Sequence, residues 1–180
     1  MSSYNTDLDK NAANYVPLTP LTFIKRAKEI YPDYEALIYE DRKYSWAEVY
    51  KRTVKFASAL SKAGIRKGDT VSFLAFNTPE IFEGHYSVPM TGAVLNTINI
   101  RLDAKTIAYI LEHSEAKVLV VDRQLHIEVK KALGILKRKI IIIDINDEHA
   151  DQSKCEKIGE LEYESFLNTG DENYDWKMPE

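Results

Sequence analysis

The chain of 180 residues is long enough for one domain, or for a large part of a bigger protein. Its 44% hydrophobic content, with 11 Tyr, 6 Phe and 2 Trp, excludes disorder for most of the chain. The longest purely aliphatic run, residues 140–143, is far shorter than the roughly 20 residues that a membrane-spanning helix needs. Because the first ten residues form no apolar signal segment, we expect a cytoplasmic protein without a membrane span.

Charge is divided unevenly along the chain, although the net charge is only −4. Residues 144–180 carry 12 acidic side chains against 3 lysines, whereas residues 1–143 carry 16 acidic and 21 basic ones. A basic body with an acidic tail has two interpretations. Either the body binds an anionic ligand, or the charged side chains simply cover solvent-exposed surfaces. Nucleic-acid binding is not expected, because no dense Lys/Arg stripe alternates with aromatic residues.

Apolar periodicity and turn residues predict the elements that follow a flexible arm at residues 1–17. Ser45 and Glu48 form a predicted capping box, and Asp103 a predicted helix cap. In chain order, we expect a helix over 18–30, a β-hairpin with strands 35–39 and 43–46, a helix from 46 to 64, a strand over 71–76, a helix from 79, a strand over 93–97, a helix from 104, a strand over 118–121, a helix over 124–136, a strand over 140–143 and a short helix over 161–167.

The predicted strands after the hairpin open at regular intervals of 24, 24 and 22 residues, at Asp69, Ala93, Lys117 and Lys139. This spacing fits a repeated strand, turn and helix, and therefore a parallel sheet with right-handed crossovers. The fold class is predicted as α/β, with a largely parallel sheet flanked by helices and an N-terminal β-hairpin. The predicted domains are the arm at 1–17, an α/β subdomain at 18–145 and an acidic tail at 146–180.

Motifs that would identify an active site are absent from the sequence. The seven glycines form neither a dinucleotide-binding G-x-G-x-x-G nor a P-loop. The four histidines include no pair at metal-binding spacing, and no G-x-S-x-G motif occurs. The single cysteine, Cys155, excludes an internal disulfide and lies in the acidic segment, where a reactive thiolate is disfavoured.

Three polar side chains are candidates for binding or chemistry. Asp122 and Asp144 each follow a predicted strand, where two carboxylates could hold Mg²⁺ as in a phosphoacceptor module. The interpretation that we favour is structural, with Asp122 capping the next helix and Asp144 opening a loop. His85, beside Tyr86, is interpreted as a packed or partly exposed histidine.

Arg101 is the most informative single residue, because it lies between a predicted buried strand and a predicted helix N-terminus. A guanidinium at such a place is well suited to bind phosphate. The alternative is an ordinary surface ion pair.

Four segments in order carry a resemblance to a known family: YSWAE at 44–48, GIRKGDTV at 64–71, VPMTGAVLNTINIRL at 88–102 and AKVLVVD at 116–122. Together they resemble the N-terminal part of AMP-forming acyl-CoA synthetases of the adenylate-forming superfamily. The resemblance runs from Leu18 to Glu180. It is greatest to acyl-activating enzymes that act on medium-chain or short aryl and alkyl acids.

The resemblance implies a ligase of fatty or other carboxylic acids that uses ATP, Mg²⁺ and CoA. Its phosphate loop, acyl pocket, ribose-binding Asp and catalytic Lys would all lie beyond Glu180. We therefore expect this chain to be inactive alone, with no catalytic residue, no metal ligand and no cofactor bound by itself. The one residue carried over from the family is Arg101, which in some CoA ligases faces the CoA nucleotide phosphate.

Two functions thus remain open at this point. The first is an N-terminal fragment of an acyl-CoA synthetase, with the carboxylic acid, CoA and the rest of the synthetase as partners. The second is a stand-alone, non-catalytic α/β binding or regulatory module derived from that fold. A receiver-like phosphoacceptor would rest on Asp122 and Asp144 alone.

Overall fold

The structure is a computed structural model that describes residues 9–11, 13–16 and 18–178. Most of the predicted arm at 1–17 therefore lies outside the described residues. The helices and strands, in chain order, are α1 (Pro20–Ile30), β1 (Glu35–Tyr39), β2 (Arg42–Ser45), α2 (Trp46–Lys62), β3 (Thr70–Leu74), α3 (Pro79–Met90), β4 (Val94–Thr97), α4 (Ala104–His113), β5 (Val118–Asp122), η2 (Arg123–Leu125), α5 (His126–Ile135), β6 (Ile141–Ile145), η3 (Gln152–Lys154), β7 (Leu161–Glu162) and α6 (Tyr163–Leu167).

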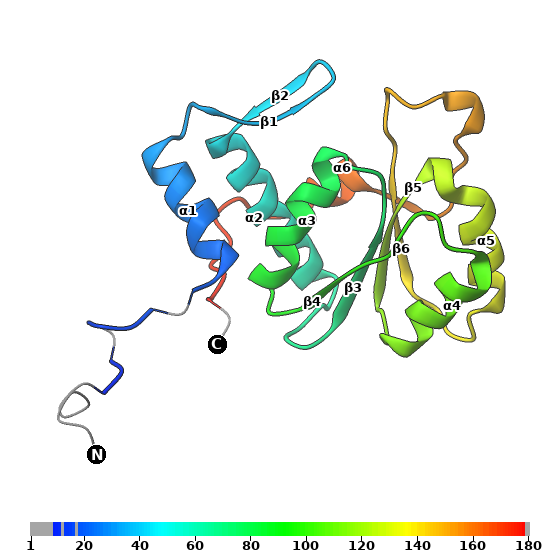
Figure 1. Cartoon of the computed structure of the whole chain (residues 1–180), viewed down its shortest axis with the longest axis horizontal. Coiled ribbons are helices and arrows are strands. Elements are labelled where there is room, and N and C mark those ends of the chain that lie inside the picture. The colour runs from blue at the N-terminus through cyan, green and yellow to red at the C-terminus, as the bar shows by residue number, and fades with distance from the viewer. Residues whose placement is uncertain (1–8, 12, 17, 179–180) are drawn as a thin grey trace.

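Five of the strands form one parallel sheet in the order β4-β3-β5-β6-β7, and β1 and β2 form a separate antiparallel hairpin. Helices α2, α3 and α6 cover one face of the sheet, while α4 and α5 cover the other (Figure 1). Helix α1 and the hairpin lie outside α2 and α3. The predicted α/β class, with a parallel sheet between helices and an N-terminal hairpin, is confirmed.

The core lies on both faces of the sheet, which explains the continuous apolar strands in the sequence. On one face, Phe56 of α2 stacks on Tyr163 of α6, with ring centroids 4.5 Å apart, and both pack toward β3. On the other face, Leu111 of α4 and Val129 of α5 cover β5. Buried apolar surface therefore fixes β3 and β5 at the centre of the molecule.

Local signals in the sequence determine where several helices begin. The Ser45 side chain accepts the Glu48 N–H while Glu48 accepts the Ser45 N–H, so the predicted capping box that starts α2 is confirmed. Asp103 caps α4 by accepting the N–H of Thr106, as predicted. Helix α3 begins with Pro79, but the Thr78 side chain makes no cap hydrogen bond.

Two sequence predictions near the end of the chain were wrong. Asp144 does not open a loop but lies inside β6, fully buried. The predicted helix over 161–167 begins instead with strand β7, which pairs with β6. Gly159 permits this close approach, since a Cβ at Gly159 would lie 2.6 Å from the backbone oxygen of Ile142.

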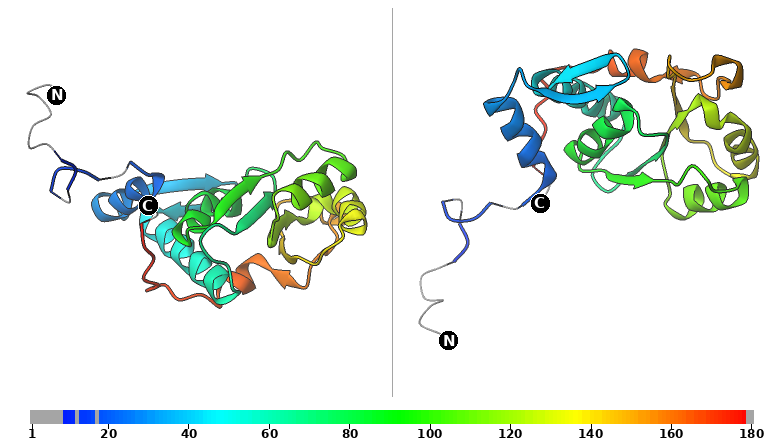
Figure 2. Two further views of the ribbon diagram at one scale, coloured as in Figure 1. Left: turned by 90° about the horizontal axis from the view of Figure 1, so that it is seen from below. Right: turned by 45° about the horizontal axis from the view of Figure 1, so that its top comes forward.

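Residues 171–178, here called the strap, leave α6 and return along α2 to α1 (Figures 1 and 2). The Trp176 indole donates to the Tyr50 hydroxyl at 3.1 Å, and the Asp171 N–H donates to the Ser58 hydroxyl at 3.0 Å. Trp176 and Met178 are half-buried against α1, α2 and α3. No helix in the described part of the chain is both long and apolar enough to cross a membrane.

Candidate functional site

A groove lies at the carboxyl ends of β3 and β4, beside α3. It consists of two adjoining hollows that share Asn77, Ile81 and His85. The hollow of about 440 Å³ is lined also by Ala75, Phe76, Thr97, Ile98, Asn99 and Ile100. The hollow of about 320 Å³ is lined also by Leu37, Ile38, Tyr39, Thr78, Pro79 and Phe82.

The sheet order places a crevice beside this groove. The chain passes from β3 to β4 on one side and then returns to β5 on the other side of β3. The helices that follow β3 and β5 thus cover opposite faces, which leaves a crevice at the carboxyl ends of these strands. Open α/β sheets bind their ligands at such points.

His85 lines both hollows of this groove. Its Nδ1 lies 2.8 Å from the carbonyl oxygen of Ile81 in the same helix. Because a carbonyl oxygen only accepts, Nδ1 carries the proton in the neutral ring and Nε2 is left as an acceptor. The side chain is exposed, in agreement with the sequence interpretation.

Arg101 follows Ile100, the last residue that lines the larger hollow. It is exposed, and its N–H donates to the Asn99 side chain at 2.9 Å. Within the described residues its guanidinium forms no ion pair or hydrogen bond, so the surface ion pair considered from the sequence is not formed there. The positive charge therefore stands beside the groove, ahead of α4.

A buried polar cluster adjoins the groove at the β3/β5 crevice, and sequence reasoning missed it. Arg42 of the hairpin donates to Glu80 of α3 at 3.1 Å and lies 4.0 Å from Asp147. The Tyr39 hydroxyl donates to Asp147 at 2.5 Å. These residues are 38 to 108 positions apart in the sequence, so no local pattern signals that they meet.

Several buried atoms of this cluster have no hydrogen-bond partner. They are Nε and Nη2 of Arg42, Oγ1 of Thr78, Oε2 of Glu80 and Oδ2 of Asp122. Burial, and then the charge of Asp147, raises the pKa of the Asp122 carboxyl. Both donors and acceptors are left unsatisfied, which is the pattern expected where water or a polar group enters.

The structure does not bring Asp122 and Asp144 together as a magnesium site. Asp122 accepts the Gln124 N–H at 2.9 Å and caps η2, as the favoured interpretation held. The Asp144 carboxylate accepts from Arg123 and from the N–H groups of Ile158 and Gly159. The described residues contain no group of three or more His, Cys, Asp or Glu that could hold a metal ion.

A second buried network joins α2, α3 and α6. The Glu83 carboxylate, 1% exposed, accepts from Arg52 at 2.5 Å and from the Tyr163 hydroxyl at 2.8 Å. Arg52 also donates to Glu164 at 2.5 Å. Burial raises the pKa of Glu83 to about 7 against the opposing effect of Arg52. This network fixes α6 to the helix layer.

Cys155 does not take part in either network. Its thiol lies 3.4 Å from the Asp151 carbonyl oxygen, and burial followed by the charge of Asp122 raises its pKa. A thiol with a raised pKa is a poor nucleophile at neutral pH, as the sequence analysis concluded.

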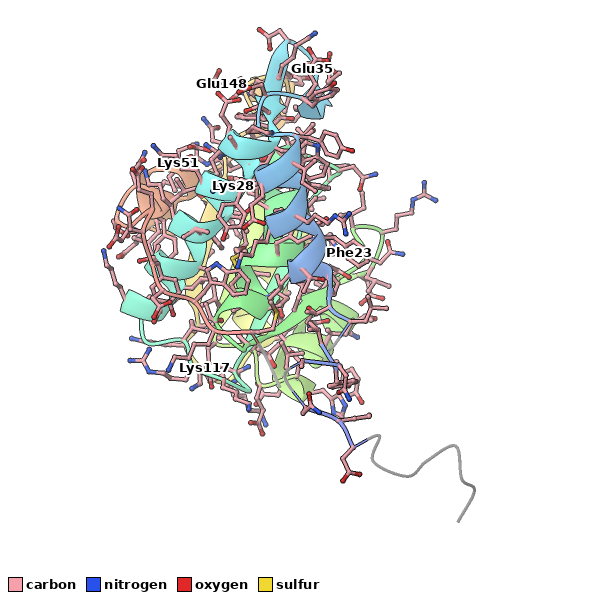
Figure 3. The ribbon with its side chains drawn as sticks, turned by 90° about the vertical axis from the view of Figure 1, so that its left-hand side faces the viewer. Phe23, Lys28, Glu35, Lys51, Lys117 and Glu148 are labelled. Atoms are coloured by element: carbon pink, nitrogen blue, oxygen red, sulfur yellow. The ribbon has the colours of Figure 1, made fainter. Side chains whose placement is uncertain are left out.

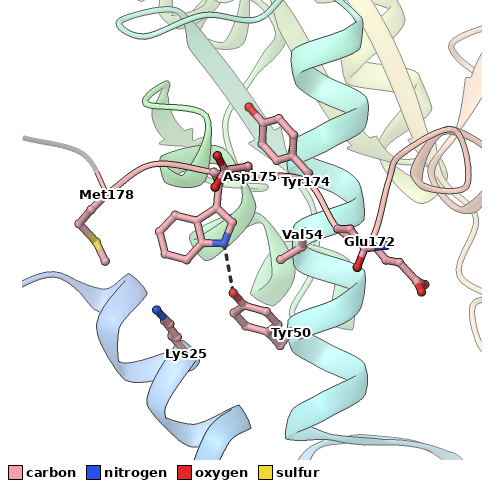
Figure 4. Close-up of a pocket in the computed structure, with 9 residues that line it drawn as sticks. Lys25, Tyr50, Val54, Glu172, Tyr174, Asp175 and Met178 are labelled. Carbon is pink, nitrogen blue, oxygen red and sulfur yellow. Dashed lines mark hydrogen bonds between the residues drawn. The ribbon is translucent and has the colours of Figure 1, made fainter.

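A hollow of about 500 Å³ lies under the strap, away from the carboxyl edge of the sheet (Figure 4). Lys25 of α1 and Tyr50 of α2 lie on one side of it, and Tyr174, Asp175 and Met178 of the strap cross the other (Figure 4). The strap thus spans this hollow, and its Trp176 indole donates to the Tyr50 hydroxyl that lines it.

The comparisons with known proteins agree with each other. Residues 24–173 match the family model described as AMP-binding enzyme. The chain is 44% identical to acetate--CoA ligase CCL3 of Humulus lupulus over 184 residues, which are 97% of this chain and 32% of that ligase. It is 41% identical to the peroxisomal acetate/butyrate--CoA ligase AAE7 of Arabidopsis thaliana, over 96% of this chain and 32% of that protein.

Solved structures show the same fold. The anthranilate CoA ligase AuaEII, in complex with anthranoyl-AMP, superposes with a TM-score of 0.78 at 20% identity, over 88% of this chain and 29% of that one. A benzoate CoA ligase from Burkholderia xenovorans gives a TM-score of 0.71 at 19% identity, over 83% of this chain and 28% of that one. The chain therefore spans about a third of the length of the curated relatives that it matches.

Proposed function

The chain belongs to the AMP-binding enzyme family, and from this premise we propose that it forms the N-terminal part of an AMP-forming acyl-CoA ligase. The observation that carries the proposal is the match of 97% of this chain to a third of an acetate--CoA ligase at 44% identity. The proposed overall reaction joins a carboxylic acid and CoA, at the expense of ATP, to give acyl-CoA, AMP and pyrophosphate.

The reaction class explains why such an enzyme needs groups that this chain lacks. A carboxylate becomes reactive when ATP converts it to an acyl-adenylate, because AMP is a better leaving group than an oxide ion. Mg²⁺ and a phosphate-binding loop, which offset the charge on phosphorus, supply that chemistry. The described residues include no such loop and no metal cluster, so we assign them binding and structural roles only.

Arg101 and the neighbouring groove are the proposed contribution to CoA binding. The guanidinium is exposed and makes no ion pair within the described residues, so a phosphate can approach it without displacing a carboxylate. The larger hollow next to it mixes apolar side chains with polar groups, among them Asn77, His85 and Asn99, and the smaller hollow beyond it is mainly apolar. This arrangement suits a ligand with an anionic head and a less polar body.

The proposed substrate is defined by its chemical class, and the proposed compartment is the cytoplasm. A carboxylic acid is the substrate class, and fatty acids are one subset of it. Cytoplasmic localisation stays a prediction, since relatives such as AAE7 carry the word peroxisomal in their names.

We propose that this chain contributes binding and structural residues and that adenylation depends on residues outside it. The test is ATP–pyrophosphate exchange by the purified chain of 180 residues, with acetate, butyrate and benzoate as acids. We expect no exchange above the protein-free blank, because the described residues include neither the phosphate loop nor a metal cluster. Exchange at the rate of an ordinary ligase would overturn the proposal that adenylation needs residues outside this chain.

A further inference from the structure

The β1–β2 hairpin covers the smaller hollow of the groove without packing tightly against its floor. Leu37, Ile38 and Tyr39 line this hollow from the hairpin side, and Thr78 and Phe82 from the side of α3. About 320 Å³ of space separates the two walls. The hairpin is not part of the parallel sheet, and a two-stranded hairpin alone has little stability.

The base and the tip of the hairpin are held in different ways. At the base, Leu37 and Tyr44 pack into the apolar cluster around α1 and α2. At the tip, polar contacts predominate: Arg42 with Glu80, Tyr39 with Asp147, and Asp41 with His149 at 2.9 Å. Figure 3 shows Glu35 of the hairpin and Glu148 of the loop after β6 at the same end of the molecule, opposite Lys117.

In the closed position of the tip, several buried polar atoms lack a hydrogen-bond partner. Arg42 uses Nη1 on Glu80, while its Nε and Nη2 are buried without a hydrogen-bond partner. Oε2 of Glu80 and Oγ1 of Thr78 are also buried without partners. Each unpaired buried group raises the free energy of the closed position, and each would bind water if the tip moved away.

We propose that the hairpin tip, residues 39–42, is a lid over the end of the smaller hollow that Tyr39 lines, and that Arg42 is its latch. The structure has the lid closed. Opening breaks a few polar contacts, hydrates the unpaired atoms and leaves the apolar base in place. The role of the lid in admitting a CoA-type ligand rests on the proposed function, whereas the motion itself does not.

Hydrogen exchange on the 180-residue chain tests the motion without any ligand. We expect the amides of the tip to exchange much faster than those of β3 and β5. Arg42→Met should speed exchange at the tip about tenfold or more, because it leaves the buried Glu80 carboxylate without its positively charged partner. The same variant should also speed exchange at 76–82, the wall that the lid covers, which fraying of the tip alone would not do.

Two further variants keep the test decisive. Thr78→Val keeps the shape and removes an unpaired buried hydroxyl, so it should slow exchange at the tip. Lys43→Met removes an exposed ion pair with Glu35 on the same hairpin and should change neither segment. The lid proposal would be overturned if the amides of the tip were as protected from hydrogen exchange as those of β3 and β5. A response to Arg42→Met that is confined to the tip, or no slowing with Thr78→Val, would also overturn it.

Discussion

Arg101 stands apart from the other arginines at the carboxyl edge of the sheet. Arg42 and Arg123 are each paired with a carboxylate, whereas the guanidinium of Arg101 is exposed and unpaired within the described residues. A positive charge without an ion pair in the part of the chain that the structure describes is available to a ligand. This contrast makes Arg101 the residue of choice for testing the CoA contact.

We predict that Arg101→Gln weakens CoA binding in a chimera in which residues 1–180 replace the corresponding part of acetate--CoA ligase CCL3. The KM for CoA should rise about tenfold or more, while the KM for ATP stays unchanged, because only a charged hydrogen bond to the CoA phosphate is lost. Dephospho-CoA should bind equally to both forms if the 3′-phosphate is the group contacted. An equal rise in both KM values would argue against a specific contact.

Glu83 makes stability depend on pH in an unusual direction. Its pKa is raised from 4.5 to about 7 by burial, so the folded chain holds the proton more tightly than the unfolded chain. The stability that this proton confers is fully present below pH 4.5 and is lost as the pH rises through about 7. Glu83→Gln, which stays neutral, should flatten the unfolding free energy between these values. Denaturant titrations across this range measure it.

The matched control is Glu164→Gln, which changes the other carboxylate on Arg52, at a half-exposed position. This variant should keep the slope of the parent chain between pH 4.5 and 7. A Glu83→Gln chain with the same slope as the parent would show that another group titrates there.

Single residues were predictable where their role is local. Asp122 and Asp103 were correctly interpreted as caps, since the side chain and the N–H that it accepts lie two or three positions apart. Arg42, Glu80 and Asp147 were missed because their contact depends on the folding of the hairpin over the sheet edge. Asp144 was wrongly assigned to a loop. Its burial in β6 depends on the N–H groups of Ile158 and Gly159, which belong to a segment whose sequence has no periodic pattern.

At the level of elements, Gly170 lies between α6 and the strap and packs closely against the backbone of α2. A Cβ at Gly170 would lie 1.9 Å from the backbone oxygen of Lys55 in α2. We predict that Gly170→Ala destabilises the chain by roughly 1–3 kcal/mol. The added methyl group would clash with the backbone of α2, which cannot rotate away as a flexible side chain could. Urea unfolding of the two proteins measures the difference.

Gly134 in α5 offers the opposite case. Nothing lies within 4 Å of a Cβ placed there. Gly134→Ala should therefore stabilise the chain by about 0.5–1 kcal/mol, since alanine loses less entropy in a helix. A destabilisation of similar size in both variants would mean that packing at Gly170 is not the cause.

Elements with a strong pattern were predictable from the sequence, and short ones were not. Strands β3 and β5 are mostly apolar because both faces of the sheet are covered, and the caps marked the starts of α2 and α4. Strand β7 has two residues, too few for any period, and is fixed by its pairing with β6 and by the small volume of Gly159. Tertiary contact, not local preference, defines it.

For the whole molecule, the regular spacing of strands led to the correct class, and four ordered segments led to the correct family. The strand order was not predictable, because the same spacing fits several orders of a parallel sheet. That order places the crevice between β3 and β5, where the buried polar cluster adjoins the groove.

The central claim is that these 180 residues can serve as the N-terminal part of an acyl-CoA ligase. The most direct measurement is acyl-CoA formation from acetate, ATP and CoA by the CCL3 chimera described above. We predict a folded chimera that makes acetyl-CoA and AMP, at a rate within roughly tenfold of the parent ligase, since 44% identity preserves most internal contacts. A folded chimera that binds ATP but forms no thioester would contradict the claim.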